Sequence, residues 1–339
     1  MMHRLIFCTL LVLLFYHPAS AQATDTLKLT LPEASRLLLQ NNIPLLAQRY
    51  NIDSAKAGVI TARLFDNPNA TFENVLYNHT TRRWFDFSYD GTNSLQVQQL
   101  FKLAGKRNKE VKLAQSGVKM SEYQFFDLLR TLRFSLNDNF YDLYYKQRSL
   151  EMYGRQVTFL QKIVKIFEQQ KALGNVAPKE IIRLKSLLYD LQHDALSLEQ
   201  DIQQTQSDLA LLVRIPPTTY IQPEVPQMAD ADMSRYSYQS LLDTAKTNRF
   251  DLKIAQETVN YNNLNLRLQK SLAVPDVTVG FVLDKQGSFE RNYNGLNVSM
   301  PLPFFNRNQG NIKAAKAVLE GSKLMLNAQE DELSHEVMN

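Results

Sequence analysis

The chain has 339 residues, enough for two domains or one large elongated domain, and its formal net charge of +4 at pH 7 is too small to indicate a polyanionic partner such as a nucleic acid. Hydrophobic residues make up 44% of the sequence and charged residues 21%, which excludes broad disorder and a low-complexity chain. Only 11 glycines occur, so we expect long helices with few turns.

The N-terminus has the three parts of a secretory signal peptide. Arg4 provides the positive charge, Leu5 to Phe15 form an apolar run, and Ala19-Ser20-Ala21 is a small-x-small cleavage site. The run is too short to span a bilayer as a helix, which needs about 20 apolar residues. Residues 1–21 are therefore predicted to be a signal peptide, the alternative being a buried N-terminal helix.

Cys8 is the only cysteine, and it lies inside this predicted signal peptide. The mature chain would therefore contain no disulfide, no thiolate metal site and no cysteine nucleophile. After residue 21 there is no apolar run of about 20 residues, which argues against membrane-spanning helices. Strands of about 10 alternating residues could still cross a membrane.

Two segments match each other and indicate an internal repeat. One ungapped offset of 207 residues joins Asn41 to Asn248, Leu45 to Leu252, and Pro68 to Pro275. Further on, an offset of 201 residues joins Leu95 to Leu296, Val97 to Val298, Lys106 to Arg307, Val111 to Ile312, and Ala114 to Ala315. The change of offset places a short deletion in the second copy, which a hairpin loop tolerates.

Both repeats are predicted to have the same order of elements. A first helix, over 32–64 and over 238–271, ends before the matched proline, which opens the first of two strands. A polar and aromatic loop, 78–92 or 285–294, joins the two strands, and a long helix follows. The residues expected to line the strands are Ala70, Phe72, Leu76, Leu95, Val97, Val277, Val279, Phe281, Leu283, Leu296 and Val298.

The first long helix is predicted over about 105–170, because this stretch lacks proline and its apolar residues recur near a 3.5-residue period. A break follows, and a returning helix ends near Val213. We assign 31–214 to a first repeat, 215–237 to an irregular, proline-rich connector, and 238–339 to an incomplete second repeat.

Four short strands cannot close into a barrel alone, and an open sheet edge in lipid costs several kcal/mol per unpaired group. If these strands span a membrane, several chains must share one barrel. A cyclic trimer would provide 12 strands, which is within the usual range for such barrels. The long helices of the same chains would then form a helical tube.

Several segments resemble those of the TolC family of outer-membrane efflux proteins. Leu29 to Ala34 with Asn41-Asn42 resembles the opening of the family, and Leu211 to Pro216 resembles the end of its returning helix. Leu173-Gly174-Asn175-Val176-Ala177 resembles the tip of its helical hairpin. The segment Pro301 to Gly310, with Pro303 and Arg307, is similar to the strand-to-helix corner of the heavy-metal branch, the CzcC-like and CusC-like proteins.

The resemblance implies a mainly α protomer with a small β part and a duplicated helix–strand–strand–long-helix plan. Three chains would share an α-helical barrel in the periplasm and a 12-stranded transmembrane β-barrel in the outer membrane. It also implies the exit duct of a tripartite efflux pump, with a periplasmic adaptor docked at Leu173 to Ala177 and an inner-membrane transporter. Small solutes would be exported, and the corner segment favours heavy-metal cations.

The second repeat departs from the family pattern, because Asn339 corresponds to Asp138, in the middle of the long helix. The counterparts of residues 139–214 are absent, and we expect the sequence to be a fragment or a truncated gene product.

No catalytic, cofactor-binding or metal-ligating constellation is recognisable, and enzymatic activity is not predicted. The aromatic cluster of Trp84, Phe85, Phe87 and Tyr89 could be an interfacial girdle or a loop packed on itself. Two other functions remain open, a periplasmic helical-hairpin adaptor and a structural coiled-coil protein without channel activity. Neither needs two pairs of alternating strands.

Overall fold

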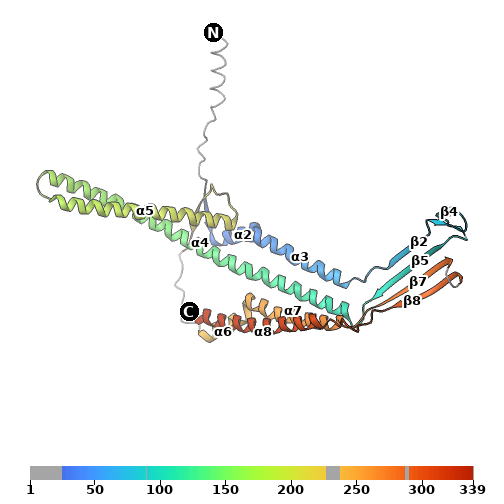
Figure 1. Ribbon diagram of the computed structural model, residues 1–339. Coiled ribbons are helices and arrows are strands. Elements are labelled where there is room, and N and C mark those ends of the chain that lie inside the picture. Colours follow the sequence, from blue (N-terminus) through green and yellow to red (C-terminus); the bar gives the residue numbers. More distant parts are fainter. Residues whose placement is uncertain (1–24, 89, 227–236, 287–289, 339) are drawn as a thin grey trace, which may run out of the picture. The chain divides into compact units, whose positions relative to one another are not determined.

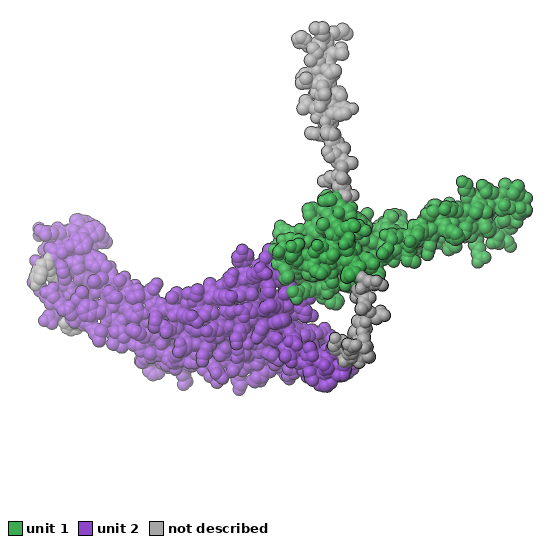
Figure 2. All heavy atoms as spheres, turned by 180° about the vertical axis from the view of Figure 1, so that it is seen from behind, with its two compact units in different colours: residues 1–43, 131–230 green, residues 44–130, 231–339 purple. Residues whose placement is uncertain are grey.

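The computed structural model describes residues 25–88, 90–226, 237–286 and 290–338. The predicted signal peptide, residues 1–21, lies outside the described residues. The chain divides into two compact units, which Figure 2 shows in different colours. The first unit comprises residues 1–43 and 131–230, and the second comprises residues 44–130 and 231–339.

The first unit contains β1 (Thr26–Thr30), α2 (Leu31–Asn41), α4 (Lys106–Ala172) from residue 131 onward, α5 (Pro178–Val213) and β6 (Tyr220–Glu224). Helix α2 begins where the sequence indicates. The backbone N–H of Thr30 donates to Oε2 of Glu33 at 3.0 Å, as in a capping box, and Pro32 lies in the first turn.

The connector over 215–237 was predicted to be irregular, and this is wrong for strand β6. Strand β6 pairs in parallel with β1, with Thr26 opposite Tyr220 and Thr30 opposite Glu224. Pro223 lies within the strand, which is possible because a two-stranded sheet leaves each strand one edge that needs no N–H donor. Ile221 is fully buried, and the side chain of Gln206 bonds both its N–H (2.9 Å) and its carbonyl (2.7 Å).

Helix α4 has the length that the sequence predicted, and its 67 residues correspond to about 100 Å of helix. It packs against α5 through a seam of buried apolar residues, with Leu160 and Val164 meeting Leu188. Val157, Ile163 and Leu184 are half-buried against this seam. The 3.5-residue period of the sequence therefore corresponds to a real antiparallel helical hairpin.

Each predicted first helix is in fact two helices, so both of these predictions need correction. In the first repeat α2 ends at Asn41 and α3 (Ile43–Arg63) follows; in the second, α6 (Tyr238–Asn248) is followed by α7 (Phe250–Leu272). The linking residues Asn42 and Arg249 have extended backbones, with ψ of 115° and 126°.

The two breaks have different local causes at equivalent positions. Pro44 has no N–H to give to the preceding turn, so a continuous helix cannot pass through it. In the second repeat, Asp251 lies in the first turn of α7, where a carboxylate favours a helix N-terminus, and the N–H of Leu252 donates to it at 2.8 Å. Burial opposes ionisation of Asp251, but the hydrogen bonds from Arg249 and Leu252 hold its pKa below the usual value.

The second unit contains a four-stranded antiparallel sheet in the order β2-β5-β7-β8, visible side by side in Figure 1. The strands are β2 (Asn69–Asn74), β5 (Asn93–Phe101), β7 (Val277–Gln286) and β8 (Arg291–Ser299). A small hairpin, β3 (Tyr77–Asn78) with β4 (Arg83–Trp84), lies in the first loop. Helix α8 (Gln309–Met338) packs on α7, where Leu266, Ala315 and Leu319 form a buried cluster. Among the described residues, no helix is both long enough and apolar enough to cross a membrane.

The two hairpins of the sheet are similar but not identical in register. In the first hairpin Ala70 pairs with Val97. Their equivalents in the second hairpin are Val277 and Val298, but Val298 pairs with Val279 instead of Val277. A shift of two residues keeps every side chain on its face of the sheet.

One predicted strand residue lies outside the sheet. The β2–β5 ladder ends at the pair Asn74 and Asn93, and Leu76 lies at a bend beyond it, 62% exposed. The chain turns there towards the β3–β4 hairpin. The alternation of apolar and polar residues therefore stops earlier in β2 than in β7, where it continues as far as Leu283.

A buried ion pair connects the two repeats where the sheet meets the helices. Lys106, the first residue of α4, is only 3% exposed, and its Nζ lies 2.6 Å from Oδ1 of Asp276, directly before β7. The same oxygen accepts the backbone N–H of Leu103 at 2.8 Å. The start of the second hairpin is therefore held at the first strand-to-helix corner.

Replacing Asp276 by Asn should destabilise the protein by about 3–5 kcal/mol, because it leaves the Lys106 ammonium buried without a carboxylate. Thermal unfolding of the purified chain, followed by far-UV circular dichroism, measures this effect. Glu224→Gln is the matched control, because it breaks the exposed Lys28–Glu224 pair, which is expected to contribute no more than about 1 kcal/mol. Equal midpoints for both variants would contradict a structural role for Lys106 and Asp276.

Candidate functional site: sheet, corner and hairpin tip

The sheet of the second unit has one continuous apolar face. Directly opposed residues of antiparallel strands lie on the same face, so the strand pairing defines rows of side chains across the sheet. One row is Ala70, Val97, Phe281 and Leu296, and the next is Phe72, Leu95, Leu283 and the polar Asn294. Val277, Val279 and Val298 lie on the same face, where Gln99 is opposite Val279. All predicted strand residues except Leu76 are thus in strands and on one face.

This face is exposed in the single chain. Leu296 is 74% exposed, Val298 61% and Phe72 58%. A contiguous apolar surface of this kind marks a contact with lipid or with another protein, because water disfavours it.

The opposite face is polar. Its rows are Asn69, Gln98, Gly280 and Asn297, then Thr71, Gln96, Val282 and Gly295, then Glu73, Ser94, Asp284 and Tyr293. Gly280 lies where a methyl group would come within 3.2 Å of the Gln98 side chain, so this face is closely filled there. The sheet therefore has one mainly apolar face and one mainly polar face.

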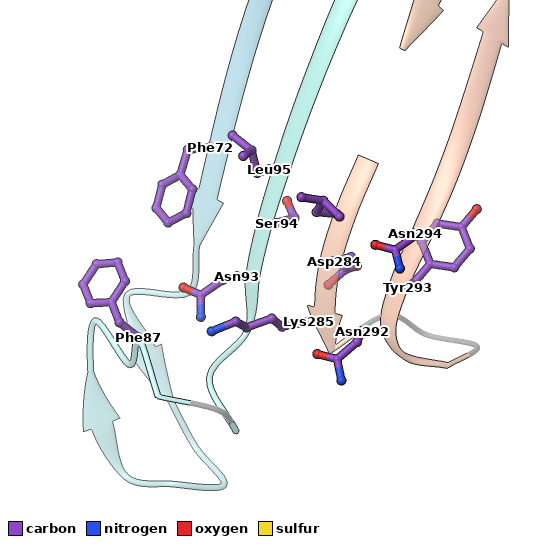
Figure 3. Close-up of a pocket in the computed structure, with 11 residues that line it drawn as sticks. Phe72, Phe87, Asn93, Ser94, Leu95, Asp284, Lys285, Asn292, Tyr293 and Asn294 are labelled. Atoms are coloured by element: carbon purple, nitrogen blue, oxygen red, sulfur yellow. The ribbon is translucent and has the colours of Figure 1, made fainter. Parts of the chain in front are cut away.

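Aromatic side chains extend the apolar face at its loop end. Phe87 stacks on Phe72 with 6.3 Å between ring centroids and 13° between planes. The two rings border a groove of about 400 Å³ whose wall also includes Leu283. Figure 3 labels Leu95 and Lys285, which line the same groove.

The loop that carries these rings also packs on itself. Tyr77 and Trp84 have ring centroids 5.2 Å apart, and hydrogen bonds from Ser88 and Thr81 lower the pKa of Asp86 to about 2. Trp84 and Phe87 nevertheless stay 69% and 63% exposed. The loop therefore has features of both predicted alternatives, and Tyr89 lies outside the described residues.

The predicted strand-to-helix corner lies between the end of β8 and the start of α8. Pro301 and Pro303 lie in it, where they cannot donate to a sheet, and Arg307 follows. Asn308 has φ of 59°, and its side-chain amide donates to the carbonyl of Gln269 at 2.8 Å, which ties the corner to α7. Gly310 lies in the first turn of α8 with open space around it.

The predicted hairpin tip lies between α4 and α5 and has a Schellman motif. Gly174 has φ of 79°, its N–H donates to Lys171, and the N–H of Asn175 donates to the carbonyl of Gln170, both at 2.9 Å. Val176 and Ala177 complete the turn before Pro178, the first residue of α5. Leu173 is 70% exposed at the tip.

The sequence analysis missed a second apolar stripe on the helical hairpin, here named the outer stripe. On α4 it consists of exposed residues at strict heptad spacing, Tyr145, Met152, Phe159 and Ile166. On α5 it consists of Ile182, Tyr189 and Leu196, also seven residues apart and each more than half exposed. At 100° per residue, the outer stripe lies about 110° around each helix from the buried seam. A search for two heptad patterns in the same helix would have found it.

Gly174→Ala should destabilise the chain by about 1 kcal/mol, because alanine is strained in the left-handed conformation. Gly154→Ala is the matched control within α4, where a methyl group meets nothing within 4 Å and should stabilise the helix by about 0.5–1 kcal/mol. Thermal unfolding midpoints should therefore move in opposite directions. A lower midpoint for Gly154→Ala, or an unchanged one for Gly174→Ala, would be inconsistent with this geometry.

No protein-family model matches the sequence. The cobalt-zinc-cadmium resistance protein CzcC of Cupriavidus metallidurans is 21% identical over 287 residues, which cover 85% of this chain and 66% of that protein. The chain thus spans just under two thirds of the length of this relative.

Solved structures share the fold. The outer membrane protein VceC of Vibrio cholerae superposes with a TM-score of 0.70 at 17% identity, over 90% of this chain and 76% of VceC. The outer membrane channel CmeC of Campylobacter jejuni gives 0.70 at 16% identity, over 88% of this chain and 67% of CmeC. CusC, whose conformation changes as it folds and forms a transmembrane channel, gives 0.66 at 15% identity, over 91% of this chain and 73% of CusC. The chain therefore has the fold that these outer-membrane protein structures share.

Proposed function

We propose that the chain is a subunit of an outer-membrane channel that serves as the exit duct of a tripartite efflux pump. The observation that carries the proposal is the sheet, which has one exposed apolar face, one polar face and two edge strands. The apolar face would contact lipid, and the polar face would line a water-filled passage.

The edges of the sheet support an oligomer. Within the described sheet, β2 and β8 each have a hydrogen-bonded neighbour on one side only. Unpaired backbone groups in lipid cost several kcal/mol each, so a sheet placed in a membrane must close. Three copies would contribute 12 strands to one barrel, and β5, β7 and β8 have the nine or ten residues that a tilted membrane strand needs.

The outer stripe supports the helical tube. One apolar seam of each helix is filled by the partner helix of the same hairpin, with Leu160, Val164 and Leu188 in the contact. The outer stripe provides a second seam, which the hairpin of another copy would cover. Helices with two seams form closed rings rather than isolated pairs.

The partners follow from the same arrangement. The tip from Leu173 to Ala177 would dock a periplasmic adaptor through its exposed leucine, and an inner-membrane transporter would supply the energy of transport. The chain would hold its place in the outer membrane, with the helical part in the periplasm, and would need no catalytic residue.

For the cargo we propose small solutes, with heavy-metal cations favoured. This rests on the relative CzcC, named for cobalt, zinc and cadmium resistance. If metal cations are the cargo, deletion of the gene from its native host should lower tolerance to these three cations, and the gene should restore it. Unchanged tolerance to all three would direct the search to other solutes.

The lipid-facing role of the apolar face can be tested with two neighbouring residues of β8. Leu296→Arg places a cation on the apolar face, at a cost of about 2–4 kcal/mol in mid-membrane, and Asn297→Arg places it on the polar face. We expect Leu296→Arg to abolish the heat-modifiable oligomer in the outer-membrane fraction. Asn297→Arg should keep the oligomer and reduce cation conductance in planar bilayers.

If both variants retained the oligomer, or if the unsubstituted chain were soluble in the periplasmic fraction, the channel proposal would fail. The adaptor or the structural coiled-coil protein would then be the remaining functions.

A further inference from the structure

The apolar face of the sheet ends at nearly the same level in all four strands, close to the loops. Its last apolar side chains towards the loops are those of Phe72 in β2, Leu95 in β5, Leu283 in β7 and Leu296 in β8. Two residues nearer the loops, and therefore on the same face, are Asn74, Asn93, Lys285 and Asn294. Three amides and one ammonium group thus follow four apolar side chains, and a boundary between apolar and polar surface crosses the sheet.

The groove of about 400 Å³ that Phe72 and Phe87 border lies on this boundary. Apolar side chains line one part of it, and Lys285 and Asn294 line another, as Figure 3 shows. Asp284 also borders the groove, but its position in β7 puts its side chain on the polar face of the sheet. The groove therefore offers an apolar wall and a polar, cationic wall to one ligand.

The loop that carries Phe87 is held in place by hydrogen bonds from a buried side chain. Asn93 is only 9% exposed, and its side-chain amide donates to the carbonyls of Asp86 and Gly91, both at 3.3 Å. A methyl group on Gly91 would come within 1.9 Å of the carbonyl oxygen of Asp86, so only glycine fits there. Phe87 stacks on Phe72 from this loop. The aromatic wall is therefore formed before a ligand binds, which lowers the entropy lost on binding.

Lys285 is the cation of the groove, and no carboxylate balances its charge there. Its side chain is exposed, and in the described part of the sheet and its loops no carboxylate lies within ion-pair distance of it. The acids of the neighbouring loop have other partners. Asp86 is 4% exposed and accepts the N–H of Ser88 at 3.0 Å, and Asp90 pairs with Arg291 at 3.0 Å. The groove is therefore suited to an anionic group.

The boundary coincides with the outer surface of the membrane in the proposed channel, on which this inference rests. In that channel the helices lie in the periplasm, so the loops lie at the outer leaflet. On the apolar side of the boundary, the side chains of β7 from Val277 to Leu283 cover about 20 Å of strand. This length is comparable to the apolar band of about 25 Å that such barrels place in lipid. A ligand in the groove would thus have its polar part at the level of the lipid headgroups and its apolar part in the leaflet.

We propose that the groove binds a phosphorylated glycolipid of the outer leaflet, with an acyl chain along Phe72 and Phe87, a phosphate at Lys285 and sugar hydroxyls at Asn294. The chemistry of the polar wall favours this ligand over other membrane lipids. An ammonium group attracts phosphate, and a side-chain amide both donates to and accepts from hydroxyl groups. A zwitterionic phospholipid would bring a second cation beside Lys285, and an anionic phospholipid offers Asn294 fewer hydroxyls than a sugar does.

Native mass spectrometry of the detergent-extracted oligomer tests the proposal, with bisphosphorylated lipid A as the probe. We expect Lys285→Gln to bind lipid A about fivefold more weakly than the unsubstituted chain, because one basic residue near a phosphate is lost. Lys285→Arg should restore binding. The difference between Lys285→Gln and the unsubstituted chain should disappear with lipid A from which both phosphates have been removed. Phe87→Ala should weaken binding of both forms, because it shortens the apolar wall.

Phe85→Ala is the matched control for Phe87→Ala, because Phe85 lies in the same loop and is 54% exposed but does not line the groove. It should bind lipid A as the unsubstituted chain does. Unchanged binding by Lys285→Gln, or equal losses for the two phenylalanine variants, would overturn the proposal. Phosphatidylglycerol is the second probe. If it bound as tightly as lipid A and with the same dependence on Lys285, the groove would be a site for any anionic lipid, and the assignment to a glycolipid would be wrong.

Two measurements on the same preparations separate failure of this proposal from failure of the proposed function. All variants should keep the heat-modifiable oligomer in the outer-membrane fraction and its conductance in planar bilayers, since the groove lies on the apolar face, away from the water-filled passage. If they do and none of them alters lipid A binding, the channel is retained and the glycolipid site is wrong. If the unsubstituted chain is soluble in the periplasmic fraction and forms no oligomer, both fail.

Discussion

The requirement that every backbone hydrogen-bonding group in a lipid environment be paired is the constraint on which the rest of this architecture depends. Within the sheet, the backbone groups of β2 and β5, of β5 and β7, and of β7 and β8 pair with each other. The outer edges of β2 and β8 have no such neighbouring strand in the described sheet. In the proposed channel, the apolar face contacts lipid, so the backbone groups at the two edges need strands of other copies as hydrogen-bonding partners. Oligomerisation is thus a consequence of the sheet rather than an additional property.

The long helices likewise have apolar surface that needs a partner. A coiled-coil pair needs one apolar seam, and α4 with α5 has one, in which Leu160, Val164 and Leu188 are buried. The outer stripe repeats at the same seven-residue spacing about 110° around each helix from this seam, and an isolated hairpin in water would have no reason to keep it. Between the sheet and the helices, the buried pair of Lys106 and Asp276 holds the start of α4 and the start of the β7–β8 hairpin together.

Local patterns in the sequence predicted the elements whose stability is local. The length of α4 follows from its heptads and its lack of proline, and the turn at Gly174 follows from the one residue type that readily adopts φ of 79°. Features that depend on distant residues were not predictable. Strand β6 exists because β1 lies beside it, nearly 200 residues away in sequence, whereas Pro223 within it and the prolines around it suggested a loop. The Lys106–Asp276 pair spans 170 residues, and no spacing rule joins its partners.

The helix breaks at Asn42 and Arg249 show what duplication preserves. The backbone break occurs at equivalent positions, but Pro44 accompanies one and Asp251 the other. The hairpin registers likewise differ by two residues while the faces stay the same. Geometry is therefore retained between the repeats although the residues that produce it have changed.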